Sequence, residues 1–436
     1  MDSNNFDFYR QPSAPKSQKG KYFLGGMATG LGVAIFISAV MFIILAIGKL
    51  ASTGQDTPVA DRIPDAQDQI TQEGVAAAGA VNEDVIEKME LIEQVIDRYF
   101  YQEETDKQAM IDSIYKGMVS SLGDPYSEYY TAEELQQTME EIQGHYYGIG
   151  AYVSMDTDMG LAKISGIIDG APASEVDVRV NDYIYKVNGE ETYGLTLTEV
   201  VSLIKGPEGT KVLITFYRDG DYVDVEVERR EVETVSVNHE MFDGGMAYIQ
   251  ITEFDMDTTP DQFVEALAAC RAKGMKGLII DLRANPGGSL DAVLNVARNI
   301  LPKGLITYTE DRDGKRKEYS GDGKRVLDVP LVVLIDGNSA SASEILAGAI
   351  KDYKMGTLVG TTTYGKGIVQ QPITLSDGSA VKLTISTYFT PNGNDVHGVG
   401  IEPDIVCEFD GDRYYSEEAY DNQLEKAKEV LAEMIQ

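Results

Sequence analysis

The sequence is poor in cysteine and histidine, and each shortage excludes a class of protein. Its 436 residues contain two cysteines, Cys270 and Cys407, which cannot form a disulfide framework, and no CxxC pair indicates a structural zinc. The three histidines, His145, His239 and His397, lie too far apart for the short spacings of common metal sites. Only carboxylate sites remain open to a metal, so we expect neither a metal nor another cofactor.

Basic residues are also scarce. The chain has 37 lysines and arginines against 71 acidic residues, a formal net charge of -34. Such a surface repels phosphate backbones, so we do not expect nucleic acid as a partner. A composition of 43% hydrophobic and 25% charged residues is typical of a globular protein, and the length fits two or three domains of roughly 150 residues each.

One long uncharged run lies near the N-terminus. Residues 22–47 carry no charged side chain, and this run exceeds the roughly 20 residues that cross a bilayer. The positive charge before it predicts a cytoplasmic tail (1–21), a single-pass anchor in the cell membrane (22–48) and an extracytoplasmic remainder. A cleaved signal peptide is the alternative, although its apolar core is normally about 7–15 residues long. Residues 49–81 lack aromatic side chains and predict a flexible linker.

Residues 82–143 predict a helical arm. Asn82 is a candidate N-cap, after which apolar residues recur at steps of four and three. A second helix from about Asp106 to Gly123 is expected to turn one apolar set inward: Ile111, Ile114, Tyr115, Met118 and Leu122. The pattern leaves open whether the apolar stripe packs within the chain or against a second copy.

The rest of the chain divides into a part rich in predicted strands, a part in which strands alternate with helices, and a final helix. Residues 144–230 hold short β-type runs between glycine- and proline-containing turns, with one helix near Thr198–Ile204. In residues 231–412, the strands AYIQI, GLIIDLR and LVVLID alternate with predicted helices near Asp261–Lys273, Leu290–Ile300 and Ser341–Lys354. These nearly unbroken apolar strands predict an α/β core with a sheet covered on both faces. Residues 413–436 predict a charged C-terminal helix.

A run of small polar residues follows the strand LVVLID and leads into a helix, GNSASASEILAGAIKD. A serine at such a junction lies beside unpaired backbone N–H groups and the positive end of the helix, which favours a developing oxyanion. Ser339, Ser341 and Ser343 are therefore candidate nucleophiles. The alternative for each is a helix N-cap without catalytic role.

Gly365-Lys366-Gly367 supplies a candidate base. If the lysine is desolvated, its pKa falls from about 10.4 towards neutrality, so that it can accept the proton of a serine hydroxyl. A serine–lysine dyad needs no histidine. The stretch GTTTYGKG also resembles a phosphate-binding loop, but Gly367 stands where that motif has Ser or Thr, and we reject an NTPase.

The stretch DLRANPGGSL, after the strand GLII, makes a tight turn whose N–H groups can point into a cleft. A plain strand-to-helix turn is the alternative. With Ser341 as nucleophile, the turn becomes one half of a candidate oxyanion hole, and the N–H of Ala342 becomes the other.

Taken together, these pieces resemble the carboxyl-terminal processing peptidases, the tail-specific serine proteases of family S41. The matching motifs occur in the family's order over about residues 83–432: GMVSSLGDPYSEYY, YYGIGAYV, DLRANPGG, GNSASASEILAGAIKD, TTYGKGIVQ and GVGIEPD. The resemblance implies a multidomain α/β (α+β) protein whose protease core has a crotonase- or ClpP-like fold.

The resemblance also implies roles for single residues. Ser341 becomes the nucleophile, Lys366 the base and Gln370 the residue that orients the lysine. The oxyanion donors become the N–H groups of Ala342 and of Gly288, with Gly287 as the neighbouring alternative. Residues four apart in a straight strand lie about 13 Å apart. Gln370 therefore reaches Lys366 only if the chain bends between them or both side chains stretch to one point.

Residues 144–230 resemble a PDZ domain. The stretch Gly148-Ile149-Gly150-Ala151 corresponds to the loop that binds a substrate's terminal carboxylate, and the strand after it would pair with the peptide. The sequence departs from the family at Glu175–Asn181, which leaves the shape of that turn open. A β-rich module that acts only as a spacer is the alternative.

The resemblance implies a membrane-anchored extracytoplasmic serine endopeptidase. Its substrates would be extracytoplasmic or membrane proteins, captured by their C-termini and cleaved through an acyl-enzyme. The helical arms resemble the family's dimerisation elements, so a homodimer is expected. One alternative is a catalytically silent, membrane-tethered PDZ scaffold, and another is a crotonase-like acyl-CoA enzyme. We expect Cys270 and Cys407 to be small apolar packing residues.

Overall fold

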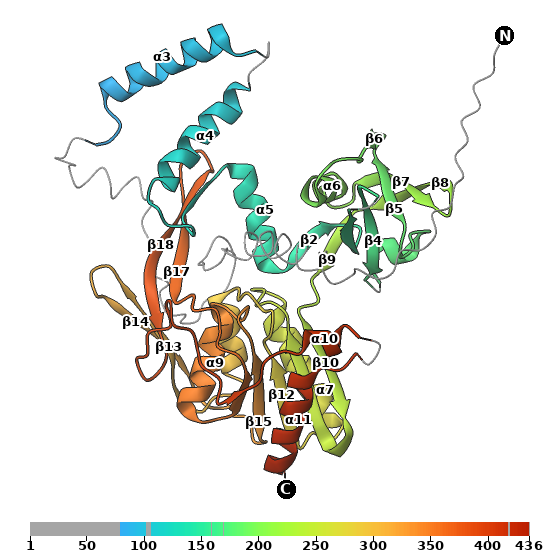
Figure 1. Cartoon of the computed structure of the whole chain (residues 1–436), viewed down its shortest axis with the longest axis vertical. Helices are drawn as coiled ribbons and strands as arrows, with labels where there is room; N and C mark the ends of the chain where they lie inside the picture. Colours follow the sequence, from blue (N-terminus) through green and yellow to red (C-terminus); the bar gives the residue numbers. More distant parts are fainter. Residues whose placement is uncertain (1–78, 102–105, 158, 169, 417–418, 436) are drawn as a thin grey trace, which may run out of the picture. The chain divides into compact units, whose positions relative to one another are not determined.

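The computed structural model describes residues 79–101, 106–157, 159–168, 170–416 and 419–435 (Figure 1). The predicted anchor, and all but the last three residues of the predicted linker, lie outside these ranges. Within them, no helix is both long enough and apolar enough to span a membrane.

The helical arm contains three helices, each started by a polar cap: α3 (Glu83–Tyr99), α4 (Lys107–Ser120) and α5 (Ala132–Gln143). The side chain of Asn82 accepts a hydrogen bond from the N–H of Val85, and that of Asp106 accepts hydrogen bonds from the N–H groups of Gln108 and Ala109. Both predicted helix starts are therefore confirmed. Thr131 caps α5 in the same way. Sequence patterning had not separated α5 from the rest of the arm.

The apolar side of α4 does not face inward as predicted. Val119 is the buried residue of this helix, whereas the predicted inward set is exposed by 39–61%: Ile111, Ile114, Tyr115, Met118 and Leu122. No residue of α3 is buried either. Within the described part of the chain, no other segment therefore buries the apolar sides of α3 and α4.

The β-rich module is built on an antiparallel sheet in the order β3-β4-β5-β7-β8, with β6 beside β5, and a separate pair β2-β9 at its ends. Its strands are β2 (His145–Gly148), β3 (Ala151–Asp156), β4 (Leu161–Ile167), β5 (Tyr183–Val187), β6 (Glu190–Glu191), β7 (Lys211–Arg218), β8 (Asp221–Glu228) and β9 (Arg230–Glu233). The predicted helix is confirmed as α6 (Leu197–Ile204). Apolar residues of the strands and of α6 form the module's own core, so it packs as a unit.

The unusual turn at residues 175–181 follows a short 3₁₀ helix, η1 (Pro172–Glu175). It ends at buried Asp182, whose carboxylate accepts the N–H of Arg179 at 2.8 Å and pairs with Arg218 at 2.6 Å. An ion pair thus fixes the turn that the sequence left open.

The core sheet runs in the order β10-β11-β12-β15-β16-β19. Its strands are β10 (Val237–Phe242), β11 (Met246–Ile251), β12 (Gly277–Asp281), β15 (Leu331–Ile335), β16 (Thr357–Gly360) and β19 (Ile405–Val406), and η2 (Asp243–Gly245) joins the first two. The helices are α7 (Thr259–Ala272), α8 (Leu290–Ala297), α9 (Ala342–Tyr353), α10 (Gly411–Tyr414) and α11 (Asn422–Ile435). Within this sheet, β11, β12, β15, β16 and β19 pair in parallel, and β10 pairs with β11 in antiparallel orientation.

Both faces of this sheet are covered, as predicted. Leu278 and Ile280 of β12 pack in the cluster formed with α7, α8 and α9, whereas Ile279 between them packs against Ala427 and Leu431 of α11. Because side chains alternate along a strand, this division explains why the strand is apolar throughout. The C-terminal helix therefore covers the second face of the sheet.

Parallel pairing also brings three loops together. The loops after β12, β15 and β16 all leave the sheet at its carboxyl edge, and these strands are direct neighbours. They carry the DLRANPGG turn, the serine run and the GKG stretch. In open parallel sheets this edge is where sites form.

A second, antiparallel sheet was not predicted. Its order is β1-β18-β13-β14, with β17 also paired to β18. The strands are β1 (Glu128–Tyr130), β13 (Gly304–Asp311), β14 (Arg316–Gly321), β17 (Ile368–Thr374) and β18 (Ala380–Phe389). Glu128 pairs with Lys382, so the end of the helical arm is tied to the strands that follow the GKG stretch.

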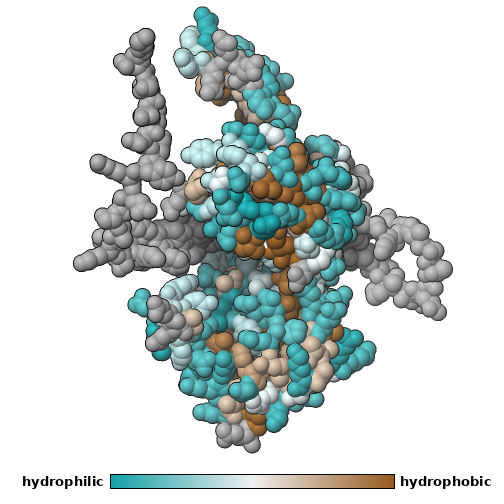
Figure 2. Space-filling view, turned by 90° about the vertical axis from the view of Figure 1, so that its right-hand side faces the viewer, coloured by the Kyte–Doolittle hydropathy of each residue, from teal (hydrophilic) through white to brown (hydrophobic). Residues whose placement is uncertain are grey.

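The face shown in Figure 2 is mostly hydrophilic, with hydrophobic residues that run down its middle, chiefly in the upper half. Both cysteines are free thiols, and both pack as expected: Cys270 is buried in the core, and half-buried Cys407 packs against the α11 side of the sheet.

Candidate active site

Of the three candidate serines, Ser341 alone keeps its hydroxyl free. Ser339 Oγ donates to the carbonyl of Leu282 at 2.8 Å, and Ser343 Oγ donates to the carbonyl of Asn285 at 3.1 Å. Ser341 is 2% exposed, and its Oγ has no hydrogen-bond partner among the described residues. The first two hydroxyls hold the loop to its neighbours, while the third is available for chemistry.

The backbone of Ser341 is strained. The residue precedes α9 with φ 55° and ψ -112°, a conformation that side-chain-bearing residues rarely adopt. Such a conformation costs of order 1–3 kcal/mol and persists only where the surroundings enforce it. Here the buried Tyr388 hydroxyl donates to the carbonyl oxygen of Ser341 at 3.1 Å, which helps to hold the turn.

The PGG turn lies directly against the nucleophile loop. A Cβ placed on Gly287, whose φ is 112°, would lie 2.8 Å from the Cβ of Ser341 and 3.1 Å from the nitrogen of Ala342, so only glycine fits there. The Gly287 N–H donates to Asn285 Oδ1 at 2.8 Å. The N–H groups of Gly288 and Ala342 donate to no other described residue. This geometry favours Gly288 over Gly287 as an oxyanion donor.

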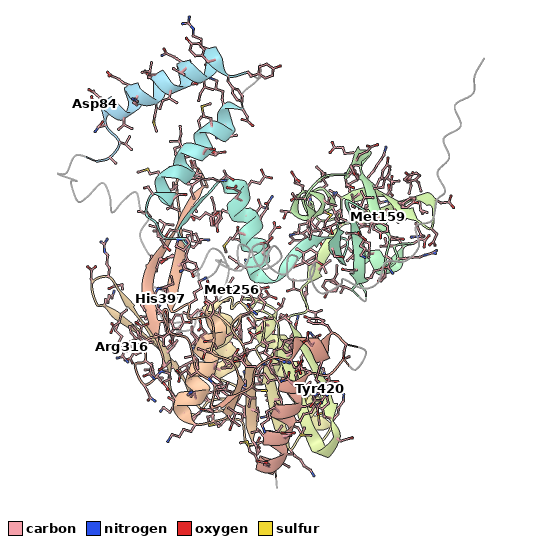
Figure 3. The ribbon with its side chains drawn as sticks, in the orientation of Figure 1. Asp84, Met159, Met256, Arg316, His397 and Tyr420 are labelled. Atoms are coloured by element: carbon pink, nitrogen blue, oxygen red, sulfur yellow. The ribbon has the colours of Figure 1, made fainter. Side chains whose placement is uncertain are left out.

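Lys366 is buried in the loop between β16 and β17. Gly367, next to it, has no room for a Cβ because the backbone of His397, labelled in Figure 3, lies against it. The lysine is 4% exposed, and its Nζ lies 4.7 Å from the centre of the Tyr126 ring. Burial, together with the nearby charge of Lys382, lowers the pKa of Lys366 to about 8.

Glu344 joins the serine loop to the lysine loop. Its buried carboxylate accepts four hydrogen bonds: from Ser341 N–H at 2.8 Å, Lys366 N–H at 2.8 Å, Gly365 N–H at 2.7 Å and Thr363 Oγ1 at 2.6 Å. Burial raises the pKa of Glu344, and these donors act in the opposite direction. One side chain on α9 therefore fixes both loops.

Gln370 is the third residue of β17 and is 1% exposed. The stretch from Lys366 to Gln370 is not a straight strand, because β17 begins only at Ile368 and its register with β18 shifts between Val369 and Gln370. The separation of about 13 Å expected for a straight strand therefore does not apply. Gln370 Nε2 donates to Thr384 Oγ1 at 3.3 Å.

The structure thus gathers the loops that carry the predicted site residues, but it does not link the serine and the lysine. Because Ser341 Oγ has no partner, no hydrogen bond joins it to Lys366 here. Sequence reasoning assigned no role to Glu344, Asn285 or Tyr126. The sequence did carry a signal for Glu344: a glutamate three residues after a serine is the capping-box pattern typical of a helix start. The described residues include no group of His, Cys, Asp or Glu side chains able to hold a metal ion.

The predicted carboxylate loop leads from β2 into β3. The carbonyl oxygens of Ile149 and Gly150 accept N–H groups of the module, from Ala173 at 2.7 Å and Ile168 at 3.0 Å. In a trans peptide the N–H points opposite to the C=O. The N–H groups of Gly150 and Ala151 therefore point away from these partners, as an anion-binding loop requires. Among the described strands β3 pairs with β4 alone, so its other edge is open to a peptide.

Comparison with known proteins identifies the parts of the chain. Residues 245–407 match the family model of peptidase family S41, residues 163–218 that of a PDZ domain, and residues 45–134 that of the activating protease CtpB N-terminal domain. The chain is similar to the carboxy-terminal processing protease CtpA of Bacillus subtilis, with 36% identity over 310 residues. That match covers 71% of this chain and 66% of the relative, slightly under two thirds of its length.

A second relative is covered more fully. The carboxy-terminal-processing protease of Bartonella bacilliformis is 36% identical over 313 residues, which cover 70% of each chain. A solved structure, the photosystem II D1 C-terminal processing protease, is 28% identical, with 73% of this chain and 86% of that chain covered and a TM-score of 0.44. Because it shares 36% identity with the Bartonella protease over 70% of each chain, the chain belongs to the carboxy-terminal processing proteases of peptidase family S41, and it carries a PDZ domain.

Proposed function

We propose that this protein is a serine endopeptidase that cleaves proteins captured by their C-termini, with Ser341 as nucleophile and Lys366 as base. The observation that carries the proposal is the free, buried hydroxyl of Ser341 on a strained turn, beside two unused N–H groups and in a loop tied through Glu344 to that of a buried lysine. Membership of the family supports the same chemistry.

In the proposed reaction, neutral Lys366 accepts the proton of Ser341 Oγ while the oxygen attacks the peptide carbonyl. The N–H groups of Gly288 and Ala342 donate to the oxyanion that forms, and removing one such donor typically costs about 3 kcal/mol of transition-state stabilisation. As the intermediate collapses, the protonated Lys366 gives this proton to the leaving amine, and the C–N bond breaks to leave an acyl-enzyme. Water then hydrolyses the ester, with Lys366 again as base and Ser341 Oγ as the leaving group. Before this step, Lys366 must move from the Tyr126 ring towards Ser341.

The PDZ domain is proposed to supply the C-terminus. A peptide that adds to the open edge of β3 would place its terminal carboxylate at the N–H groups of Gly150 and Ala151, near Gly148 and Ile149. Partly buried side chains of β3 and α6 are apolar and pack against the core of the module: Ala151, Val153, Met155 and Leu197. This composition favours substrates with apolar tails.

Amidating the C-terminus of an apolar-tailed substrate should slow its cleavage. The amide lacks the charge that the loop N–H groups recognise, so we expect KM to rise roughly tenfold or more, equivalent to one lost charge-assisted hydrogen bond. Steady-state kinetics on matched free and amidated peptides measures the effect. A short peptide that spans only the cleavage site serves as control, and amidating its C-terminus should not change its rate of cleavage. Equal rates for the matched free and amidated substrates would contradict carboxylate capture.

We also propose that the protein works as a membrane-anchored homodimer. The support is the uncharged run at residues 22–48 with its positive flank, and the exposed apolar faces of α3 and α4, including Ile92, Val95 and Met118. The full chain should stay in the pellet when membranes are washed with alkaline carbonate. A chain that begins at Asn82 should be released and sediment as a dimer, which Ile92→Glu converts to a monomer. Release of the full chain by carbonate would contradict the membrane anchor. A monomeric state of the unsubstituted chain that begins at Asn82 would contradict the dimer.

A further inference from the structure

The segment of the helical arm between α4 and β1 lies against the candidate active site. It holds Asp124 and Tyr126, and β1 at its end pairs with β18. Tyr126 contacts the ammonium of Lys366 through its ring, and Asp124 lies close enough to act on the charge of that lysine. This segment has no part in the chemistry proposed above, which leaves its polar side chains unexplained.

Asp124 is the end of a short chain of hydrogen bonds. Its Oδ2 accepts the hydroxyls of Thr384 and Ser127, each at 2.6 Å, and its Oδ1 accepts the N–H of Tyr126 at 3.0 Å. Burial raises the pKa of Asp124, but the hydrogen bonds from Ser127, Thr384 and the N–H of Tyr126, together with the charge of Lys366, hold it below its usual value. An ionised carboxylate only accepts hydrogen bonds.

This fixes the direction of the next bond. Thr384 has a single hydroxyl hydrogen, and it points to Asp124. The oxygen of Thr384 can therefore only accept from Gln370, which must present its Nε2–H groups, as the 3.3 Å contact shows. The amide of Gln370 cannot be reversed without placing its Oε1 against an oxygen that has no hydrogen to offer.

The fixed amide leaves an acceptor unused. Gln370 Oε1 and Ser341 Oγ are the buried side-chain atoms without a hydrogen-bond partner in the described part of the chain. Leaving such atoms unpaired is costly, and a native structure retains them where function needs them. An ammonium or amine group can bond to both an amide oxygen and a hydroxyl. Lys366 is the buried amine in the loop that leads into the strand of Gln370.

We infer that Asp124 is a positioning residue for the catalytic lysine: through Thr384 it holds the amide of Gln370 so that Oε1 receives Lys366 when the lysine leaves the Tyr126 ring. The inference deepens the proposed function and rests on it. The helical arm thereby contributes a side chain that sets the geometry of the protease core without touching substrate.

Asp124→Asn and Thr384→Val test this relay. The amide of asparagine can donate through its NH₂ group as well as accept through its oxygen, so it no longer fixes the direction of the Thr384 hydroxyl. Valine removes that hydroxyl, so neither variant holds the amide of Gln370 in one orientation. We expect kcat to fall roughly tenfold or more in each, with KM changed less than about twofold, because a misplaced base affects the chemical step. The kcat of the double variant should be no lower than that of the less active single variant, because both substitutions act on the same chain of hydrogen bonds.

One conservative variant is the matched control. Thr384→Ser keeps the hydroxyl that joins Asp124 to Gln370, so its kcat should stay within about twofold of the wild type. Unchanged kcat in Thr384→Val, or losses that multiply in the double variant, would overturn the inference.

A second readout does not depend on proteolysis. In the full protein labelled with ¹⁵N-glutamine, assigned by comparison with Gln370→Ala, the Gln370 side-chain amide signals should shift in Asp124→Asn and Thr384→Val and stay in place in Thr384→Ser. Signals that do not move in Thr384→Val would refute the relay. If the signals behave as expected but the wild type shows no serine-dependent cleavage, the proposed function fails and the relay stands as a structural feature.

Discussion

Ser341→Ala and Lys366→Ala are each expected to abolish peptide cleavage, with a loss in kcat of about 10⁴-fold or more, because each removes one half of the proposed dyad. Both variants should stay folded. Ser341 Oγ makes no hydrogen bond, so its removal breaks none, and removing the Lys366 amine relieves the burial of a polar group. Cleavage of an unfolded, apolar-tailed peptide, with thermal unfolding measured alongside, tests this.

Two further variants sharpen the test. Lys366→Arg keeps a positive charge but cannot lose it near neutral pH, so it should be as inactive as alanine. Lys324→Ala, which removes a side chain that is 82% exposed, should be fully active. Retained cleavage in either Ser341→Ala or Lys366→Ala would rule out the dyad.

The pH profile of the wild type provides an independent check on the base. The pKa of Lys366 is lowered to about 8, mainly by burial. The base must be neutral, and the neutral form grows as the pH rises through the pKa. We therefore expect kcat/KM to increase from pH 6 to about 8 and to level off above it. A flat profile over this range would exclude Lys366 as the base.

Replacing Glu344 is expected to have the second largest effect, on stability and activity together. Glu344→Ala leaves the four donors that converge on this carboxylate without an acceptor in a buried site. The expected loss in unfolding free energy is about 3–5 kcal/mol, as for the removal of one partner from a buried charged network. The loops of Ser341 and Lys366 lose their common anchor, so kcat should fall at least as far as for a mispositioned base, about 10²-fold.

Glu344→Gln is the graded control. One of its two terminal atoms still accepts hydrogen bonds, while the other becomes an NH₂ group that faces two donors, so it should lose about half as much stability as Glu344→Ala. Urea denaturation and steady-state kinetics measure both quantities. A glutamine variant as stable and as active as the wild type would show that the carboxylate does not hold the two loops.

Much of the core and of the site could be predicted because its signals are local. The strands of Ile279 and Val332 are apolar throughout since both faces of the sheet are covered, and the sequence shows this directly. The N-caps Asn82 and Asp106 are equally local signals. Two of the site loops could be found because each follows an apolar strand, and the third because Lys366 stands between two glycines. Their convergence depends on parallel pairing that only the topology supplies.

What could not be predicted depends on contacts between distant segments. The pairing of β1 with β18 joins Glu128 to Lys382 across 254 positions, and no local pattern indicates it. Asp124 and Tyr126 lie directly before β1 and are brought to the site with it, whereas Thr384 faces Gln370 across the β17–β18 pair. The apolar stripe of α4 was correct as a helix signal but wrong as a burial signal, because periodicity shows that a face is apolar and not what covers it.

The placement of the site on three neighbouring strand ends has a consequence for the nascent chain. The hydroxyl, the amine and the N–H donors lie on separate stretches of sequence, and they meet only when β12, β15 and β16 have paired. An incompletely folded molecule therefore carries the proposed nucleophile and base without their arrangement. We expect it to have no proteolytic activity until these neighbouring strands have paired.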